Sequence, residues 1–148
     1  MSTLIGRIVK YSPVYLRIAI GLTFLSAVAD RFGLWGGPGE NLVAWGNFQN
    51  FLDYTALLNP YLPTLMVPVI GWIVTIAEIV LGAALIIGFR IRETALISGI
   101  LLLFFAVSMA VSIGIKSPLD YSVFTASAAA FFLSTHTDIL STNNRKEH

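Results

Sequence analysis

The chain has the length of one ordinary domain but an extreme hydrophobic content. It has 148 residues, of which 56% are hydrophobic and only 11% charged, and its mean hydropathy is +0.80. A water-soluble domain of this size needs a largely polar exterior, so we expect the lipid bilayer to be its main partner. The sequence has no cysteine, which excludes disulfides and thiolate-bound iron–sulfur centres. The net charge of +1 does not indicate a nucleic-acid partner.

Four apolar stretches predict an all-α fold, an integral membrane four-helix bundle forming one domain over residues 1–148. Continuous apolar runs of this length are expected to be helical, because lipid cannot satisfy exposed backbone N–H and C=O groups. The second and third stretches are long enough to cross a bilayer, whereas the first and fourth need flanking residues. The predicted spans are 14–30, 64–89, 94–115 and 119–135, with an outer segment at 31–63 and a cytoplasmic tail at 136–148.

The first span carries polar residues on two faces. Arg17 lies on one face with Gly21, Phe24, Val28 and Arg31, and Thr23, Ser26 and Asp30 share a second face. The second face predicts a wet vestibule at the outer membrane surface, although Asp30 and Arg31 are also typical of a plain helix end. A cleaved secretory signal is the alternative for this segment, because Ala27-Val28-Ala29 resembles a cleavage site. Arg17 next to so short an apolar run argues against cleavage.

The outer segment contains a predicted amphipathic interfacial helix over residues 40–55. Its apolar residues recur at spacings of three and four. One interpretation is that its aromatic residues anchor the helix among lipid headgroups. The alternative is a lid over a cavity between the spans, and the candidate lid residues are Trp45, Phe48, Phe51 and Tyr54.

Glu78 is the most informative residue of the second span. Counted at ~1.5 Å per residue from Arg90, it lies near the bilayer midplane, where a charge costs roughly 2.5 to 3.5 kcal/mol. Gly71, Thr75 and Gly82 share its helical face, so Glu78 is expected to face a neighbouring helix. Arg17 is the expected partner, either directly or through water; the alternative is that Arg17 reaches the inner headgroups.

The third and fourth spans contain no charge and show small residues at helix-packing intervals. His136 and His148 are too few and too terminal for a haem held within the membrane, and no metal-spaced cluster or catalytic triad is evident. We therefore expect no metal site, no haem and no iron–sulfur cluster.

The basic residues predict the orientation in the membrane. Seven of the nine Lys and Arg residues fall on one side under the four-span arrangement, and only Arg31 and Lys116 fall on the other. The positive-inside rule then places both termini in the cytoplasm. We expect a multi-pass protein of a bacterial-type cytoplasmic (inner) membrane. The seven residues are Arg7, Lys10, Arg17, Arg90, Arg92, Arg145 and Lys146.

Two sequence segments resemble the DoxX family of small four-helix membrane proteins. They are Leu16-Arg17-Ile18-Ala19-Ile20-Gly21-Leu22 with Asp30-Arg31-Phe32, and Ala77-Glu78-Ile79-Val80-Leu81-Gly82 with Gly88-Phe89-Arg90-Ile91-Arg92. The resemblance covers roughly residues 16–103. It implies a membrane component of a redox system or a membrane chaperone, and the family's intramembrane Arg and Glu match Arg17 and Glu78.

Three functions are open at this stage. The first is a non-catalytic membrane subunit of a redox or quinone-linked complex, in which a quinone binds beside Arg17 and Glu78. The second is a scaffold, assembly factor or chaperone whose buried charges only fix helix register. The third is a small carrier that uses Glu78 as its coupling site. A protein partner subunit or a homo-oligomer is expected in each case.

Overall fold

The computed structural model describes the backbone of residues 2–146 and the side chains of residues 4–136, and every regular element within these is helical. The expectation of an all-α fold is thus confirmed. Some residues used above for the orientation and the predicted tail have side chains outside the described residues; they are Arg145, Lys146 and His148. The helices are α1 (Ser2–Arg31), α2 (Phe48–Leu58), α3 (Met66–Ile87), α4 (Ile91–Ile113), α5 (Lys116–Asp120) and α6 (Val123–Lys146).

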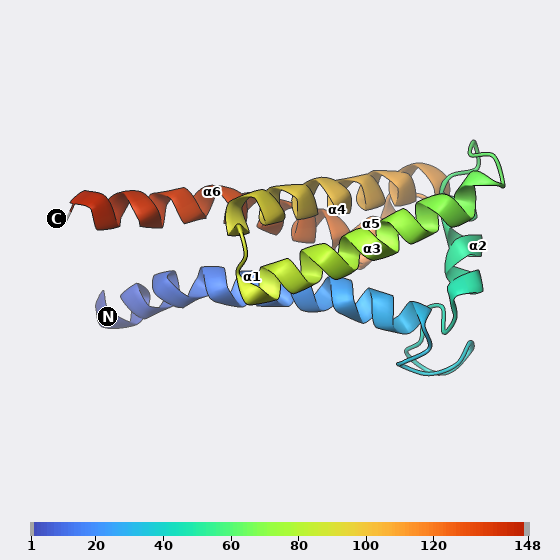
Figure 1. Ribbon diagram of the computed structural model, residues 1–148, viewed down its shortest axis with the longest axis horizontal. Helices are drawn as coiled ribbons and strands as arrows, with labels where there is room; N and C mark the ends of the chain where they lie inside the picture. Colours follow the sequence, from blue (N-terminus) through green and yellow to red (C-terminus); the bar gives the residue numbers. More distant parts are fainter. Residues whose placement is uncertain (1, 147–148) are drawn as a thin grey trace.

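The long helices run lengthwise in two packed pairs, with α1 against α3 and α4 against α6. Figure 1 shows that α2 lies across one end of these helices and that both ends of the chain lie at the other. The connection between α1 and α2 loops out beside α2. The connections on either side of α2 therefore lie, with α2, at the end of the molecule remote from the termini.

Three helices within the described residues are long and apolar enough to cross a membrane. They are Leu4–Arg31, Met66–Ile87 and Ile91–Ile113. Their outward faces are apolar as well, since Ile73, Val80 and Phe104 are exposed, and such faces suit lipid and not water. The chain is thus an integral membrane protein of helical type.

The predicted fourth span, 119–135, is not one continuous helix. α5 ends at Asp120, and Ser122 adopts a positive φ of 55°, a conformation that breaks a helix. The apolar part of α6, Val123–His136, is shorter than the three spans above. The backbone of the predicted tail, from residue 136, continues the helix, because α6 extends to Lys146.

The first helix begins earlier than the predicted span, and α2 begins later than the predicted interfacial helix. Helix α1 runs through Pro13, and the Ser12 hydroxyl donates to the Val9 carbonyl that Pro13 cannot reach. Helix α2 begins after Asn47, whose side chain accepts from the amide of Asn50 and caps the helix. Residues 40–47 are therefore turns, although the apolar spacing continues through them.

Small residues set the distance within both helix pairs. A Cβ on Gly21 of α1 would lie 2.8 Å from the carbonyl oxygen of Gly82 on α3, so the two backbones touch here. In the other pair, Gly99 of α4 faces the ring of Phe131 on α6, and Ser127 donates to the Gly99 carbonyl. The Gly21–Gly82 contact fixes the register of α1 against α3, and so decides which polar side chains meet.

Candidate functional site

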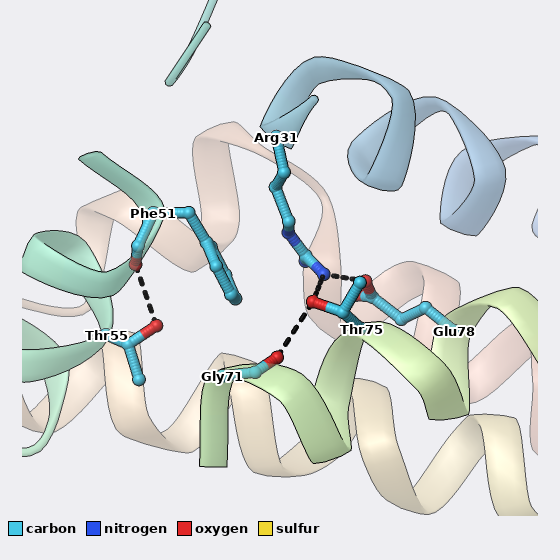
Figure 2. A network of polar contacts seen from close by, with 6 residues as sticks. All are labelled: Arg31, Phe51, Thr55, Gly71, Thr75 and Glu78. Carbon is cyan, nitrogen blue, oxygen red and sulfur yellow. Dashed lines mark hydrogen bonds and ion pairs between the residues drawn. The ribbon is translucent and has the colours of Figure 1, made fainter. Parts of the chain in front are cut away.

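A buried ion pair joins the C-terminal end of α1 to the middle of α3. The guanidinium Nη1 of Arg31 contacts Oε2 of Glu78 and donates to the hydroxyl of Thr75, 3.0 Å away. Both charged side chains are only 3% exposed. Figure 2 shows Arg31 extending from the α1 end toward Thr75 and Glu78 on the neighbouring helix. The charge of Glu78 is thus matched inside the protein and faces no lipid.

Helix α2 and the loop before it cover the Arg31 side of this ion pair with aromatic rings. The guanidinium carbon of Arg31 lies 3.8 Å from the ring centre of Phe51 and 5.3 Å from that of Trp45. Both distances suit a cation–π interaction, which is stronger where water is excluded. Arg31 is therefore held by a carboxylate, a hydroxyl and two rings from three parts of the chain.

Two small or short residues allow α2 to come this close. Gly71 has no Cβ, and a Cβ there would collide with the side chain of Leu52. The Thr75 hydroxyl donates to the Gly71 carbonyl and so presents its lone pair to Arg31. On α2, the Thr55 hydroxyl donates to the Phe51 carbonyl, so this hydroxyl is not left unpaired under the cover (Figure 2). The face shared by Gly71, Thr75 and Glu78 is thus entirely buried.

The remaining candidate lid residues extend the aromatic cover sideways. Phe48 packs against Trp72 of α3 with ring centres 4.5 Å apart and stacks on Phe32. Tyr54 lies beside Trp45 at 6.0 Å. Phe32 and Trp72 were not singled out from the sequence, where an exposed aromatic near a membrane surface is equally typical of an interfacial anchor.

The predicted pairing of Arg17 with Glu78 is wrong. Arg17 donates to the carbonyl of Leu85, 3.4 Å away, and its guanidinium packs on Gly88 at the C-terminal end of α3. Leu85 lies two helical turns, about 10 Å, from Glu78. The register set by Gly21 and Gly82 brings Arg31 and not Arg17 to Glu78. Arg17 instead stabilises a helix C-terminus, where backbone carbonyls lack partners.

Asp30 fixes the loop that follows α1. Its Oδ2 accepts the backbone amides of Ala44 and Trp45, each at 3.0 Å. The residue is 6% exposed, and its Oδ1 is buried with no hydrogen-bond partner. Asp30 and Arg31 are therefore not a pair at a helix end. One holds the loop and the other holds α3.

A hollow of about 580 Å³ opens between α1 and this loop. The side chains of Thr23, Ser26 and Asp30 line it from the helix, as the second polar face of α1 predicted. The loop side was not identified from the sequence, and there the Trp35 indole donates to the Ser26 carbonyl. The full lining is Leu22, Thr23, Ser26, Ala27, Asp30, Trp35, Leu42, Ala44 and Trp45.

The site thus consists of two parts with different chemistry. The ion pair of Arg31 and Glu78 is closed and desolvated, and its two charges compensate each other, which suits a structural lock. The hollow is open and is lined by Asp30, whose buried Oδ1 has no hydrogen-bond partner, which suits a ligand. Within the described residues, no three histidine, aspartate or glutamate side chains lie close enough to hold a metal ion.

Comparison with known families identifies the relationship of the chain. The family described as methylamine utilisation protein MauE matches residues 9–122, most of the sequence, and the chain belongs to this family. The resemblance to the DoxX family is therefore wrong as an assignment: its apolar and glycine-containing segments are shared by many membrane helices. No curated protein and no solved structure matches the chain.

Proposed function

We propose that this member of the MauE family is a membrane-embedded, non-catalytic accessory of a redox system that serves methylamine utilisation. The family description supports the process, and the absence of cysteine from the sequence means that any thiol chemistry in that system belongs to a partner. The accessory acts by holding a partner protein at the membrane and by presenting its outer loop and α2 to that partner.

The observation that carries this proposal is the closure of the Arg31–Glu78 pair. An acid–base or coupling carboxylate must exchange protons or ions with a substrate or with water. The Glu78 side chain is only 3% exposed, and the guanidinium of its partner Arg31 lies against the rings of Phe51 and Trp45 and also donates to Thr75. A pair of this kind fixes the position of α1 against α3 and supports the outer cover. It does not supply a reactive group.

The test replaces the ion pair by apolar side chains of similar volume. Removing both charges of a buried pair is often neutral for stability, whereas removing one leaves the other uncompensated. We expect Arg31→Met/Glu78→Leu to fold and to support growth on methylamine in a host whose own copy of the gene is deleted. Lys116→Met/Asp120→Leu, which removes an exposed ion pair of the outer end, is the matched control.

A double variant that reaches the membrane at normal levels but supports no growth would overturn the accessory role. That result would assign Glu78 or Arg31 a direct chemical part, as in the carrier hypothesis. A quinone headgroup polarised by Arg17 and Glu78 finds no support here, because those two residues do not meet. Chemical crosslinking from Gly39→Cys in the outer loop is expected to capture a protein of the same redox system.

We also propose a four-span topology with both termini on the cytoplasmic side of the inner membrane. Both ends of the chain lie at one end of the helices in Figure 1, and the turn between α3 and α4 faces the same way. Arg7 and Lys10 belong to the first part of α1, and Arg90 and Arg92 to that turn and the start of α4. For α6 to serve as the fourth span, polar residues beyond its apolar part must contribute length. The 148 residues then form one membrane domain.

The absence of cysteine makes this topology directly testable. Single cysteines at Gly39, in the outer loop, and at Glu93, next to the turn between α3 and α4, provide one label on each side. A membrane-impermeant maleimide added to intact spheroplasts is expected to modify Gly39→Cys at once and Glu93→Cys only after lysis. The reverse pattern would invert the orientation, and labelling of both would refute the span count.

A further inference from the structure

We propose that the hollow beside Asp30 binds an organic ammonium ion, a primary amine carrying an alkyl chain. The inference is independent of the accessory role, because it concerns a different side of α1 from the Arg31–Glu78 pair. It rests on three properties of the hollow: its charge, its aromatic residues and its shape.

The charge of the hollow is negative and is not compensated locally. Asp30 is the one charged residue of the lining, and no lysine or arginine accompanies it. The neighbouring Arg31 already contacts Glu78. Oδ2 of Asp30 is occupied by two backbone amides, whereas Oδ1 is buried without a partner. A charged donor that reached this oxygen from the hollow would form a charge-assisted hydrogen bond with it, a bond that no described group of the protein provides.

Two indole rings stand beside this carboxylate. Trp35 and Trp45 both line the hollow, and ring faces attract alkylammonium ions as well as protein cations. Trp35 is 62% exposed, so its ring is free to adjust around a ligand while its position is guided by the bond to the Ser26 carbonyl. A site that combines a carboxylate with indole rings binds a cation in preference to an anion or a neutral molecule.

The shape of the hollow requires more than a bare ammonium ion. Its volume of about 580 Å³ falls in the range of small-molecule sites, and its polar and apolar residues are separated along α1. Asp30 lies at the outer end, whereas Leu22 lies two turns deeper on a face that is exposed toward the lipid. An ammonium group at Asp30 therefore leaves an attached alkyl chain lying along Leu22 and Ala27.

The ammonium group has two sources, a soluble alkylamine or an ethanolamine lipid, and separate experimental arms distinguish them. In the first arm, the chain in nanodiscs of phosphatidylcholine and phosphatidylglycerol is titrated with methyl-, butyl- and hexylammonium at constant ionic strength. Tryptophan fluorescence reports binding, and hexanol is the uncharged control. In the second arm, native mass spectrometry measures phosphatidylethanolamine retained from mixed-lipid nanodiscs.

Asp30→Asn is the decisive variant, because its side-chain oxygen still accepts the amides of Ala44 and Trp45 while the charge is lost. We expect at least tenfold weaker amine binding, or loss of the retained lipid. Asp53→Asn is the matched control: this exposed acid of α2 bonds only to Gln49 among the hydrogen bonds described, and its removal is expected to change nothing. Ser26→Phe blocks the hollow without altering Asp30 and is expected to abolish binding even if Asp30→Asn misfolds.

Saturable binding in either arm that Asp53→Asn keeps and that both Asp30→Asn and Ser26→Phe weaken supports the site and identifies its source; if Asp30→Asn misfolds, Ser26→Phe decides. Two results would overturn it: no saturable binding of any amine together with no retained ethanolamine lipid, or binding that a folded Asp30→Asn or Ser26→Phe variant leaves unchanged. Neither result affects the accessory role, which is measured by growth and crosslinking.

Discussion

The two helix pairs of this protein are held together by different means. The α1–α3 pair buries the charges of Arg31 and Glu78 and brings two glycine backbones into contact. The α4–α6 pair buries small apolar residues, and its hydroxyl-to-backbone bond from Ser127 joins neutral groups. Ala95, Ala106 and Ala130 of this second pair have no exposed surface.

The difference shows where the molecule requires one exact arrangement. Small residues allow two helices to approach closely, but adjacent registers offer similar contacts. A guanidinium must meet its carboxylate, because either charge alone in the membrane interior is costly. The α1–α3 pair therefore has one favourable register, and it is this pair that supports both the aromatic cover and the hollow.

The largest expected effect comes from breaking the ion pair on one side. Glu78→Leu leaves Arg31 buried without its carboxylate, and a guanidinium cannot lose its proton to escape the cost. We expect a loss of about 3 to 5 kcal/mol in the free energy of unfolding, measured by titration with SDS in mixed micelles. Adding Arg31→Met should restore most of it. A loss below about 1 kcal/mol would mean that the pair does not hold the helices together.

The next largest effects are expected from adding a methyl group at a helix contact, and the loss of stability should again differ between the two helix pairs. In Gly21→Ala the new methyl meets the backbone oxygen of Gly82, which cannot move without shifting α3. In Gly99→Ala it meets the ring of Phe131, a side chain that can turn. Overpacking costs about 1 to 3 kcal/mol, so we expect the upper end for Gly21→Ala and the lower end for Gly99→Ala. Equal losses in the same SDS titration would refute the contrast between backbone and side-chain contact.

A smaller difference is expected between the hydroxyl groups of the two pairs. Thr75→Val removes the acceptor of an Arg31 hydrogen bond, and bonds to charged groups contribute about 1.5 to 3 kcal/mol. Ser127→Ala removes a neutral bond, for which about 0.6 kcal/mol is typical inside a membrane. Circular dichroism melts of the purified variants should rank them in this order. The reverse order would show that Thr75 contributes little to holding Arg31.

The sequence predicts local features of the α1–α3 pair, but it does not predict which arginine pairs with Glu78. Glu78 and the small residues on its face follow the helical repeat, so their burial is readable from spacing alone. Arg17 and Arg31 also share one face, and spacing does not distinguish them. The choice depends on how far α1 slides along α3, which the Gly21–Gly82 contact decides between residues 61 positions apart in the chain.

The start of α2 is a second feature that a distant contact decides and that local spacing does not predict. The apolar spacing over residues 40–47 is compatible with a helix, and no local signal opposes it except the glycine at 46. In the folded chain, the amides of Ala44 and Trp45 are bonded to Asp30, so they are drawn into a loop instead. A distant acceptor here overrides local periodicity, and the hollow exists because of it.

The smallest expected effect concerns Tyr54 of α2, which is close enough to Tyr121, the residue after α5, for the two phenols to interact. Burial raises the pKa of the Tyr54 phenol above its ordinary 10.0, and the nearby Tyr121 adds to the shift. Because the unfolded chain releases this proton more readily, stability is constant below pH 10 and falls as the pH rises through that region. Tyr54→Phe should remove this part of the alkaline loss in pH-dependent melts, whereas Tyr61→Phe, at an exposed position, should keep it. If both variants lose stability as steeply as the unmodified chain, the Tyr54 phenol is not buried in the folded protein, and the cover over the α1–α3 pair is looser than its aromatic contacts indicate.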